Sequence, residues 1–297
     1  MKKHNEMKLD LHIHSCFSDG GEEWDYAKIV NEAVKNSVEL ISITDHDVAT
    51  DVILLKKHCM GTGVSFLTGA EFSSMLNGNS HDILGYGFDW HNDAIIKLMD
   101  SNLIHQAVSY NQKEDFWIEL LIEAGYLIDW KEWTMFEGGA KPSPGNQFKL
   151  KILSFLIQKG ICRDREDYFD RLYPITSGTP FTKLPTFPHP SEVIKVIKTA
   201  GGIPVLAHPV WRYNKLPLTD TLDLFKDLEI EGIECYRSDF NNETSNVCRQ
   251  FCESNNLIIT AGSDHHGTTN DDKKIGSPAI TINECNLGVL MDKIIYY

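Results

Sequence analysis

Short runs rich in β-branched and aliphatic residues recur along the chain, and polar residues that could bind a metal lie at or near the end of each. The runs with their polar residues are residues 8–14 with His12 and His14, 38–44 with Asp45 and His46, 64–72 with Glu71, 203–207 with His208, and 257–261 with Asp264 and His266. Stretches with helical spacing of apolar residues lie between several of these runs. This alternation indicates βα units and an α/β fold built on a largely parallel sheet or barrel. In α/β barrels the catalytic groups gather at the carboxyl ends of the strands.

The first run carries the most specific pattern, Asp10-Leu-His-Ile-His14, followed by Ser18-Asp19-Gly20. Alternate side chains of a strand share a face. We therefore expect the polar residues of this run to point to one side and its three apolar residues to the other, where they can pack on helices; the apolar residues are Leu9, Leu11 and Ile13. Two histidines one residue apart, with the carboxylate of Asp19 nearby, indicate a metal site.

Length and composition limit the classes of protein. The 297 residues allow one large domain or one domain with an insertion. The net charge of −14 argues against a broad basic surface for nucleic acid. No apolar run approaches the roughly 20 residues that span a bilayer, and the N-terminus does not have the pattern of a secretory signal. We therefore expect no membrane partner and a cytoplasmic protein.

The middle of the chain, residues 91–189, differs from the rest. Its helical patterns are broken by stretches rich in glycine and proline, and it contains several tryptophans that need burial. The βα alternation resumes after it. We expect residues 91–189 to form a helical insertion, or cap, in a barrel made by residues 1–90 and 190–297.

Several motifs resemble the PHP (polymerase and histidinol phosphatase) family of metal-dependent phosphoesterases. They occur in the family's order and include Asp10-Leu-His-Ile-His-Ser15, Thr44-Asp-His-Asp47, Gly69-Ala-Glu-Phe-Ser73, Ala207-His-Pro209, Gly232-Ile-Glu-Cys-Tyr236 and Gly262-Ser-Asp-His-His-Gly267. The resemblance implies a distorted (β/α)7 barrel that holds two or three metal ions. The middle segment is similar to the insertion of the family's stand-alone phosphoesterases.

The resemblance also implies a set of metal ligands. One ion would be bound by His12, His14 and Asp264, a second by Asp19 and His46, and Glu71 would bridge the two. A third would be bound by His208, His266 and a histidine before Ile83, for which His81 is the candidate. Because adjacent strand residues face opposite sides, Asp82 is an alternative to His81.

Histidines and carboxylates without cysteine suit Mn, Fe, Zn or Mg rather than a structural zinc. Two or three such ions predict hydrolysis of a phosphomonoester by metal-activated hydroxide, with Glu71, Asp264 and His46 as catalytic residues. The substrate would be a nucleotide, an oligonucleotide end or a small phosphorylated metabolite. Two arginines that follow strand-end motifs, Arg212 and Arg237, are candidates to bind its phosphate.

Two alternatives remain at this point. One is a histidinol phosphatase, which the large insertion disfavours. The other is a non-catalytic metal-binding module, which the intact ligand set disfavours. The insertion also lacks the Arg-Pro-His-like patch expected of the branch it resembles, and has Lys141-Pro-Ser-Pro-Gly-Asn-Gln-Phe148 instead. The sequence therefore predicts the chemistry but neither the substrate nor the oligomeric state.

Overall fold

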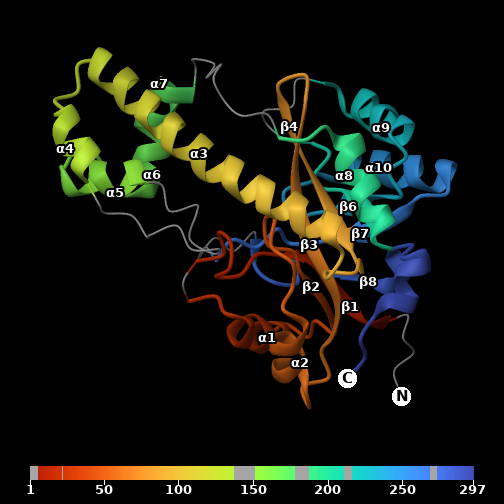
Figure 1. The fold of residues 1–297 in the computed structure, drawn as a ribbon. Coiled ribbons are helices and arrows are strands. Elements are labelled where there is room, and N and C mark those ends of the chain that lie inside the picture. The colour runs from red at the N-terminus through yellow and green to blue at the C-terminus, as the bar shows by residue number, and fades with distance from the viewer. Residues whose placement is uncertain (1–5, 22, 137–150, 178–186, 211–215, 268–272) are drawn as a thin grey trace. The chain divides into compact units, whose positions relative to one another are not determined.

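The structure is a computed structural model that describes residues 6–21, 23–136, 151–177, 187–210, 216–267 and 273–297 (Figure 1). The chain divides into two compact units. The first, which we call the barrel unit, contains Met1–Asn102 and Phe187–Tyr297. The second, the insertion unit, contains Leu103–Thr186. The Lys141–Phe148 stretch lies outside the described residues.

The barrel unit is built on one sheet of eight strands in the order β7-β6-β5-β4-β3-β2-β1-β8. The strands are β1 (Lys8–Ile13), β2 (Leu40–Ile43), β3 (Ser65–Leu76), β4 (Asn79–Tyr86), β5 (Ile203–Leu206), β6 (Gly232–Tyr236), β7 (Ile258–Ala261) and β8 (Ile280–Thr281). Strands β1 to β3 run parallel, as do β5 to β7, whereas β4 is antiparallel to both of its neighbours. Strand β8 pairs antiparallel with the start of β1.

The sheet nearly closes on itself where the end of β1 meets the segment after β7. The His14 amide donates to the His265 carbonyl at 3.0 Å, and the Asp264 amide donates to the His12 carbonyl at 2.8 Å. This closure confirms the predicted α/β barrel, with an antiparallel β4 and a short β8 that the sequence did not indicate. It also brings the first and last metal-site motifs together.

The expected alternation along β1 is wrong in part. The pairing of β1 with β2 shifts register between Asp10 and Ile13, as at a β-bulge. Leu9 and Leu11 therefore join a cluster that draws residues from around the whole sheet, including Leu84. Ile13 instead packs in a different cluster, with residues of two helices. The irregularity breaks the two-residue period on which the expectation rested.

Helices of the barrel unit cover the outer face of the sheet (Figure 1). They are α1 (Tyr26–Lys35), α2 (Val52–Cys59), α8 (Pro190–Thr199), α9 (Leu218–Asp227) and α10 (Asn242–Asn255), with 3₁₀ turns at Ile282–Glu284 and Gly288–Lys293. Several of these helices are capped at their start by a side chain that accepts from a backbone amide. Asp25 accepts from the Lys28 amide at α1, and Asp51 accepts from the Leu54 amide at α2. In the described part of the chain, no helix is long and apolar enough to cross a membrane.

A hairpin joins β3 and β4 through Asn77-Gly78. Both residues have positive φ, 50° and 79°, which is the conformation of a two-residue hairpin turn. The turn sets a register in which Ser73 pairs with Asp82 and Ser74 with His81. This register decides which of these two β4 residues faces the metal-site motifs.

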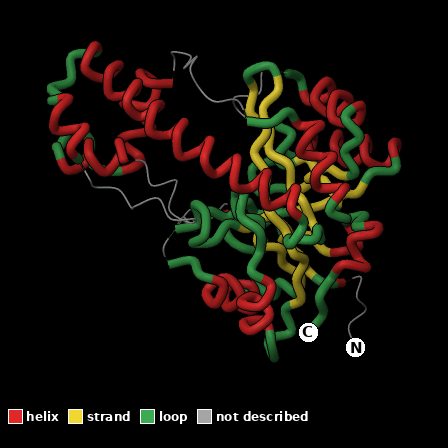
Figure 2. The backbone as a smooth tube through the Cα atoms, viewed as in Figure 1, coloured by secondary structure: helices red, strands yellow, loops and turns green. Residues whose placement is uncertain are grey.

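The described part of the insertion unit is helical, as predicted (Figure 2). Its elements are the end of α3 (Asp93–Glu123), α4 (Trp130–Met135), α5 (Lys151–Gln158), α6 (Arg165–Asp167), a π-helical turn (Tyr168–Leu172) and α7 (Tyr173–Ser177). Trp133, Phe155 and Tyr168 are fully buried in its core. The Trp133 indole donates to Asp115 at 2.7 Å, so the core satisfies that polar group.

Glu114 makes the stability of the insertion unit depend on pH. This residue of α3 is buried, its carboxylate accepts from the Ile152 amide of α5 at 3.0 Å, and burial raises its pKa to about 7. The folded unit therefore keeps a proton that the unfolded chain loses near pH 4.5. The free energy of unfolding should be highest below that pH and fall by about 3 kcal/mol as the pH rises to 7.

Urea unfolding of the protein at pH 4.5 to 8 measures this dependence. Glu114→Gln should make the decline about 3 kcal/mol smaller than in wild type, because the amide does not titrate, and exposed Glu119→Gln is the matched control. An unchanged decline in Glu114→Gln would contradict the assignment.

Candidate metal centre

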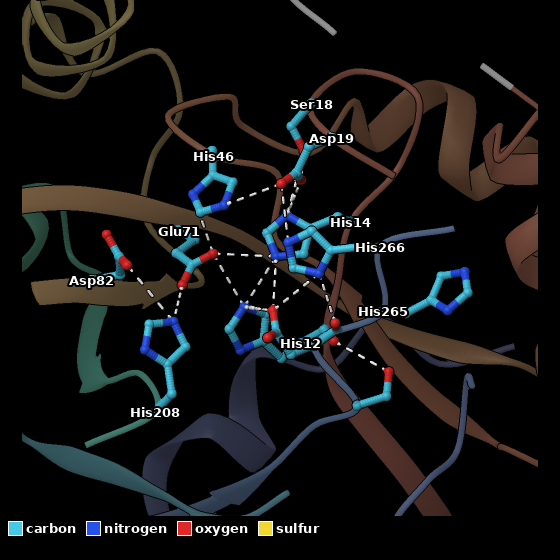
Figure 3. Close-up of polar contacts among 12 residues, drawn as sticks. His12, His14, Ser18, Asp19, His46, Glu71, Asp82, His208, His265 and His266 are labelled. Atoms are coloured by element: carbon cyan, nitrogen blue, oxygen red, sulfur yellow. Dashed lines mark hydrogen bonds and ion pairs between the residues drawn. The ribbon is translucent and has the colours of Figure 1, made fainter. Parts of the chain in front are cut away.

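Histidines and carboxylates from six strands and the loops that follow them converge in one place (Figure 3). They come from β1 and the loop after it (His12, His14 and Asp19), from the loop after β2 (His46), from β3 (Glu71) and β4 (Asp82), from the loop after β5 (His208) and from the segment after β7 (Asp264 and His266). The structure therefore brings together the predicted ligands, apart from His81. Their ligand atoms form three overlapping groups, and within each group these atoms lie within 4.8 Å of one another.

The first group contains His12, His14, Glu71 and Asp264, all buried. The Nε2 atoms of His12 and His14 are 3.2 Å apart, and each lies 3.2 Å from Glu71 Oε2. Asp264 Oδ1 lies 3.5 and 3.3 Å from the same two nitrogens. Four donor atoms thus face one small volume, which suits a tetrahedral or larger coordination shell.

Glu234 fixes the ring of His12. His12 Nδ1 donates to Glu234 Oε1 at 2.9 Å, because a carboxylate can only accept. The other oxygen of Glu234 accepts from the His208 amide at 2.9 Å. The proton on Nδ1 leaves the lone pair of His12 Nε2 directed at the first group, which is how metal-binding histidines are oriented.

Ser18 and Asp45 fix the ring of His14 in the same way. The Ser18 hydroxyl donates to Asp45 at 2.6 Å, so its oxygen accepts from His14 Nδ1 at 3.3 Å. Asp45 also accepts from the Ser15 amide and hydroxyl, which holds the loop that carries Asp19. The lone pair of His14 Nε2 therefore points at the same volume as that of His12.

The second group contains His14, Asp19, His46 and His266. His266 Nδ1 donates to the Asp264 carbonyl at 2.7 Å, and its Nε2 lies 3.0 Å from Asp19 Oδ2. His46 Nε2 lies 3.8 Å from the same oxygen. Burial would raise the pKa of Asp19, but His266, His14 and His46 hold it well below its usual range. His266 was expected to bind the same ion as His208, but the structure places it in the second group, apart from His208.

Glu71 connects the groups. Its Oε2 faces His12, His14 and His46 at 3.2 to 3.3 Å, and its Oε1 lies 2.9 Å from His208 Nε2. Burial would raise the pKa of Glu71, but the surrounding imidazoles hold it well below its usual range, so it is an anion.

The chemistry of Glu71 Oε2 provides a test of whether the residues fit a metal. Glu71 is 1% exposed, and within the described residues Oε2 has no hydrogen-bond partner despite three nearby nitrogens. A buried carboxylate oxygen without a donor is costly in a folded protein. A cation shared by that oxygen and the lone pairs of His12 and His14 removes the cost. The donor set therefore fits a metal.

The third group contains Glu71, Asp82 and His208, with His208 Nε2 3.7 Å from Asp82 Oδ2. The hairpin register turns His81 to the opposite face of β4, where its ring packs 5.1 Å from that of Phe225. The choice of His81 over Asp82 is therefore not supported by the geometry. The Asn77-Gly78 turn is the sequence signal that could have decided between them.

The structure describes one of the two arginines predicted to bind phosphate. Arg212 lies outside the described residues. Arg237 is 3% exposed and its guanidinium is paired with Asp239 at 2.7 and 2.8 Å and with Asp264 Oδ2 at 3.0 Å. Lys273 also donates to Asp264 Oδ2, at 2.6 Å. Sequence reasoning missed Lys273, and it gave Glu234 no role although the motif that contains it was identified.

Two site residues adopt backbone conformations that are unfavourable for side chains other than glycine. His208 has φ 24° and Asp264 has φ 52°. Such conformations cost roughly 1–3 kcal/mol each and persist where surrounding contacts hold them. Here the Glu234 carboxylate holds the His208 amide, and the His12 carbonyl holds the Asp264 amide.

Comparison with known proteins supports the resemblance to the PHP family. The PHP domain family model matches residues 10–132. The phosphoribosyl 1,2-cyclic phosphate 1,2-diphosphodiesterase of Eggerthella lenta is 26% identical over 87% of this chain and 94% of its own. A 5′-3′ exoribonuclease of Haemophilus influenzae is 25% identical, over 87% and 90%. A 3′,5′-nucleoside bisphosphate phosphatase of Chromobacterium violaceum is 23% identical, over 90% of each chain.

Two solved structures share the fold. An amidohydrolase from Chromobacterium violaceum with bound sulfate superimposes with a TM-score of 0.76, at 22% identity over 97% of each chain. A Bifidobacterium adolescentis protein, described provisionally as a metal-dependent phosphoesterase, has a TM-score of 0.69 at 23% identity over 92% of each chain. These two structures show the fold, and the match of residues 10–132 to the PHP domain family model confirms the resemblance to the PHP family seen in the ordered motifs.

Proposed function

We propose that this protein is a metal-dependent phosphoesterase that hydrolyses phosphomonoesters of a nucleotide, an oligonucleotide end or a small metabolite. The observation that carries the proposal is the buried Glu71 carboxylate, which belongs to two of the three donor groups and lies 3.3 Å from His46 of the other, at the face where α/β barrels hold their active sites. The named relatives, which act on phosphoric esters, support the same class of reaction. We further propose that it acts in the cytoplasm.

We assign the ligands by group. His12, His14, Glu71 and Asp264 would hold one ion, Asp19, His46 and His266 a second, and Glu71, Asp82 and His208 a third. We assign His14 to the first ion because Ser18 occupies its Nδ1 and leaves Nε2 for that ion. Divalent ions in such a site activate water and neutralise charge on phosphoryl oxygens.

The remaining charged groups support these ligands. Arg237 and Lys273 both pair with the outer oxygen of Asp264, so this carboxylate stays ionised while its inner oxygen faces His12 and His14. Arg237 is therefore proposed as a positioning residue. Lys273 is about a quarter exposed, and is the better candidate to contact a substrate phosphate.

Phosphodiester hydrolysis is the second candidate function. It is favoured by the Eggerthella lenta diphosphodiesterase, which matches this chain over 94% of its own length. Histidinol phosphatase and a non-catalytic module are the remaining alternatives, and a single panel of substrates distinguishes all four.

The panel compares kcat/KM of the metal-loaded protein on nucleoside 3′,5′-bisphosphates, 5′-nucleotides, phosphorylated oligonucleotides, histidinol phosphate, cyclic phosphodiesters and bis-p-nitrophenyl phosphate. We expect the highest value on a nucleotide or oligonucleotide monoester. Glu71→Gln should lower kcat by at least about a thousandfold, because a neutral amide replaces the shared anionic ligand. Glu231→Gln, at the opposite end of β6 from the site, is the control. If the protein turns over none of these substrates with Mn, Fe, Zn or Mg, the proposal that it is an enzyme is refuted.

Glu234→Gln tests how the His12 ring is held. The amide keeps the shape of the side chain but loses the negative charge that Nδ1 of His12 donates to. We expect the dissociation constant for Mn²⁺, measured by calorimetry, to rise about 10- to 100-fold. Glu231→Gln should leave it unchanged. Equal affinities in wild type and Glu234→Gln would show that Glu234 does not orient a ligand.

A further inference from the structure

The three donor groups differ in chemistry. The first has two imidazoles and two carboxylates, the second three imidazoles and one carboxylate, and the third one imidazole and two carboxylates, Glu71 and Asp82. Imidazole suits Zn and Fe, whereas carboxylate oxygen suits Mg and Mn. The third group is the only one of the three in which carboxylates outnumber imidazoles.

The placement of Asp82 is a consequence of the β3–β4 hairpin. Asp82 pairs with Ser73, which lies two residues from Glu71 on the same strand, so both acids point to one face. His81 would have made this group rich in imidazole, but it faces the ring of Phe225. The register thus selects an oxygen ligand over a nitrogen ligand at this position.

In the described part of the chain, no lysine or arginine forms an ion pair with the carboxylates of the third group. Asp264 in the first group is paired with Arg237 and Lys273. By contrast, the ion pairs of Glu71 and Asp82 in the described part of the chain are all with histidines. Two carboxylates near one imidazole attract a compact divalent cation, which supplies positive charge that no lysine or arginine among the described residues supplies there.

We propose that the Glu71–Asp82–His208 group selects an oxygen-preferring cation of the Mn²⁺ and Mg²⁺ class, whereas the other two groups hold Zn²⁺ or Fe²⁺. This rests on the proposed function, because it assumes that all three groups bind metal. Asp82 is then the residue that sets the metal identity at one position of the centre.

Metal competition tests the proposal without an activity assay. Zn²⁺ binds most nitrogen and oxygen sites more tightly than Mn²⁺ does, so Mn²⁺ is supplied in large excess over a low, buffered concentration of Zn²⁺. After unbound metal is removed, elemental analysis counts both metals per chain. One variant is Asp82→His, which adds an imidazole. The other is Asp82→Asn, which has the shape of the native side chain, so a loss of Mn²⁺ in this variant is not explained by misfolding. Exposed Asp89→Asn is the control for loss of a charge.

Wild type and Asp89→Asn should each hold about two Zn²⁺ and one Mn²⁺. Asp82→His should replace the Mn²⁺ with a third Zn²⁺, and Asp82→Asn should lower Mn²⁺ content at least tenfold. Zn²⁺ alone in wild type, or Mn²⁺ content that neither Asp82 variant changes, would overturn the selectivity while leaving the phosphoesterase intact. Absence of any bound metal would instead overturn the proposed function along with it.

Discussion

A buried carboxylate that needs a cation underlies this site. Glu71 is ionised and almost fully enclosed, and its Oε2 has no hydrogen-bond partner among the described residues. In a protein interior an oxygen of this kind costs free energy unless a positive charge meets it. Histidine rings surround Glu71, and the donor sets built on them are the basis of the proposed centre.

Hydrogen bonds at the Nδ1 atoms of His12 and His14 leave the Nε2 lone pairs of these rings available for a metal. Glu234 accepts a hydrogen bond from Nδ1 of His12, and Ser18, which donates to Asp45, accepts one from Nδ1 of His14. Glu234 lies on β6, so its contact links β6 to β1, and it also holds the His208 amide. The Ser18–Asp45 hydrogen bond links the loops after β1 and β2. Closure of the barrel between β1 and the segment after β7 then brings Asp264 to the same place. The fold and the site therefore depend on the same hydrogen bonds.

Much of this could be predicted from residue types and order. The α/β fold followed from the alternation of strands and helices, and the family resemblance implied that its sheet forms a barrel. The convergence of the His and Asp motifs followed from their places at strand ends. The errors arose where the chain departs from regular geometry. The irregularity of β1 separated Ile13 from Leu11, and the antiparallel hairpin put Asp82 rather than His81 beside His208. Partners distant in sequence, such as Arg237 with Asp264, could not be assigned from spacing, since they depend on tertiary packing.

The metal content of the reconstituted protein tests the central claim most directly. Apo protein is loaded with Mn²⁺ or Zn²⁺, passed through a desalting column and measured by elemental analysis, alongside Glu71→Gln. The account predicts two to three ions per wild-type chain and a clear loss of bound metal in Glu71→Gln, because this side chain belongs to two of the donor groups. One ion or none in the wild type, or the same content in both proteins, would contradict it.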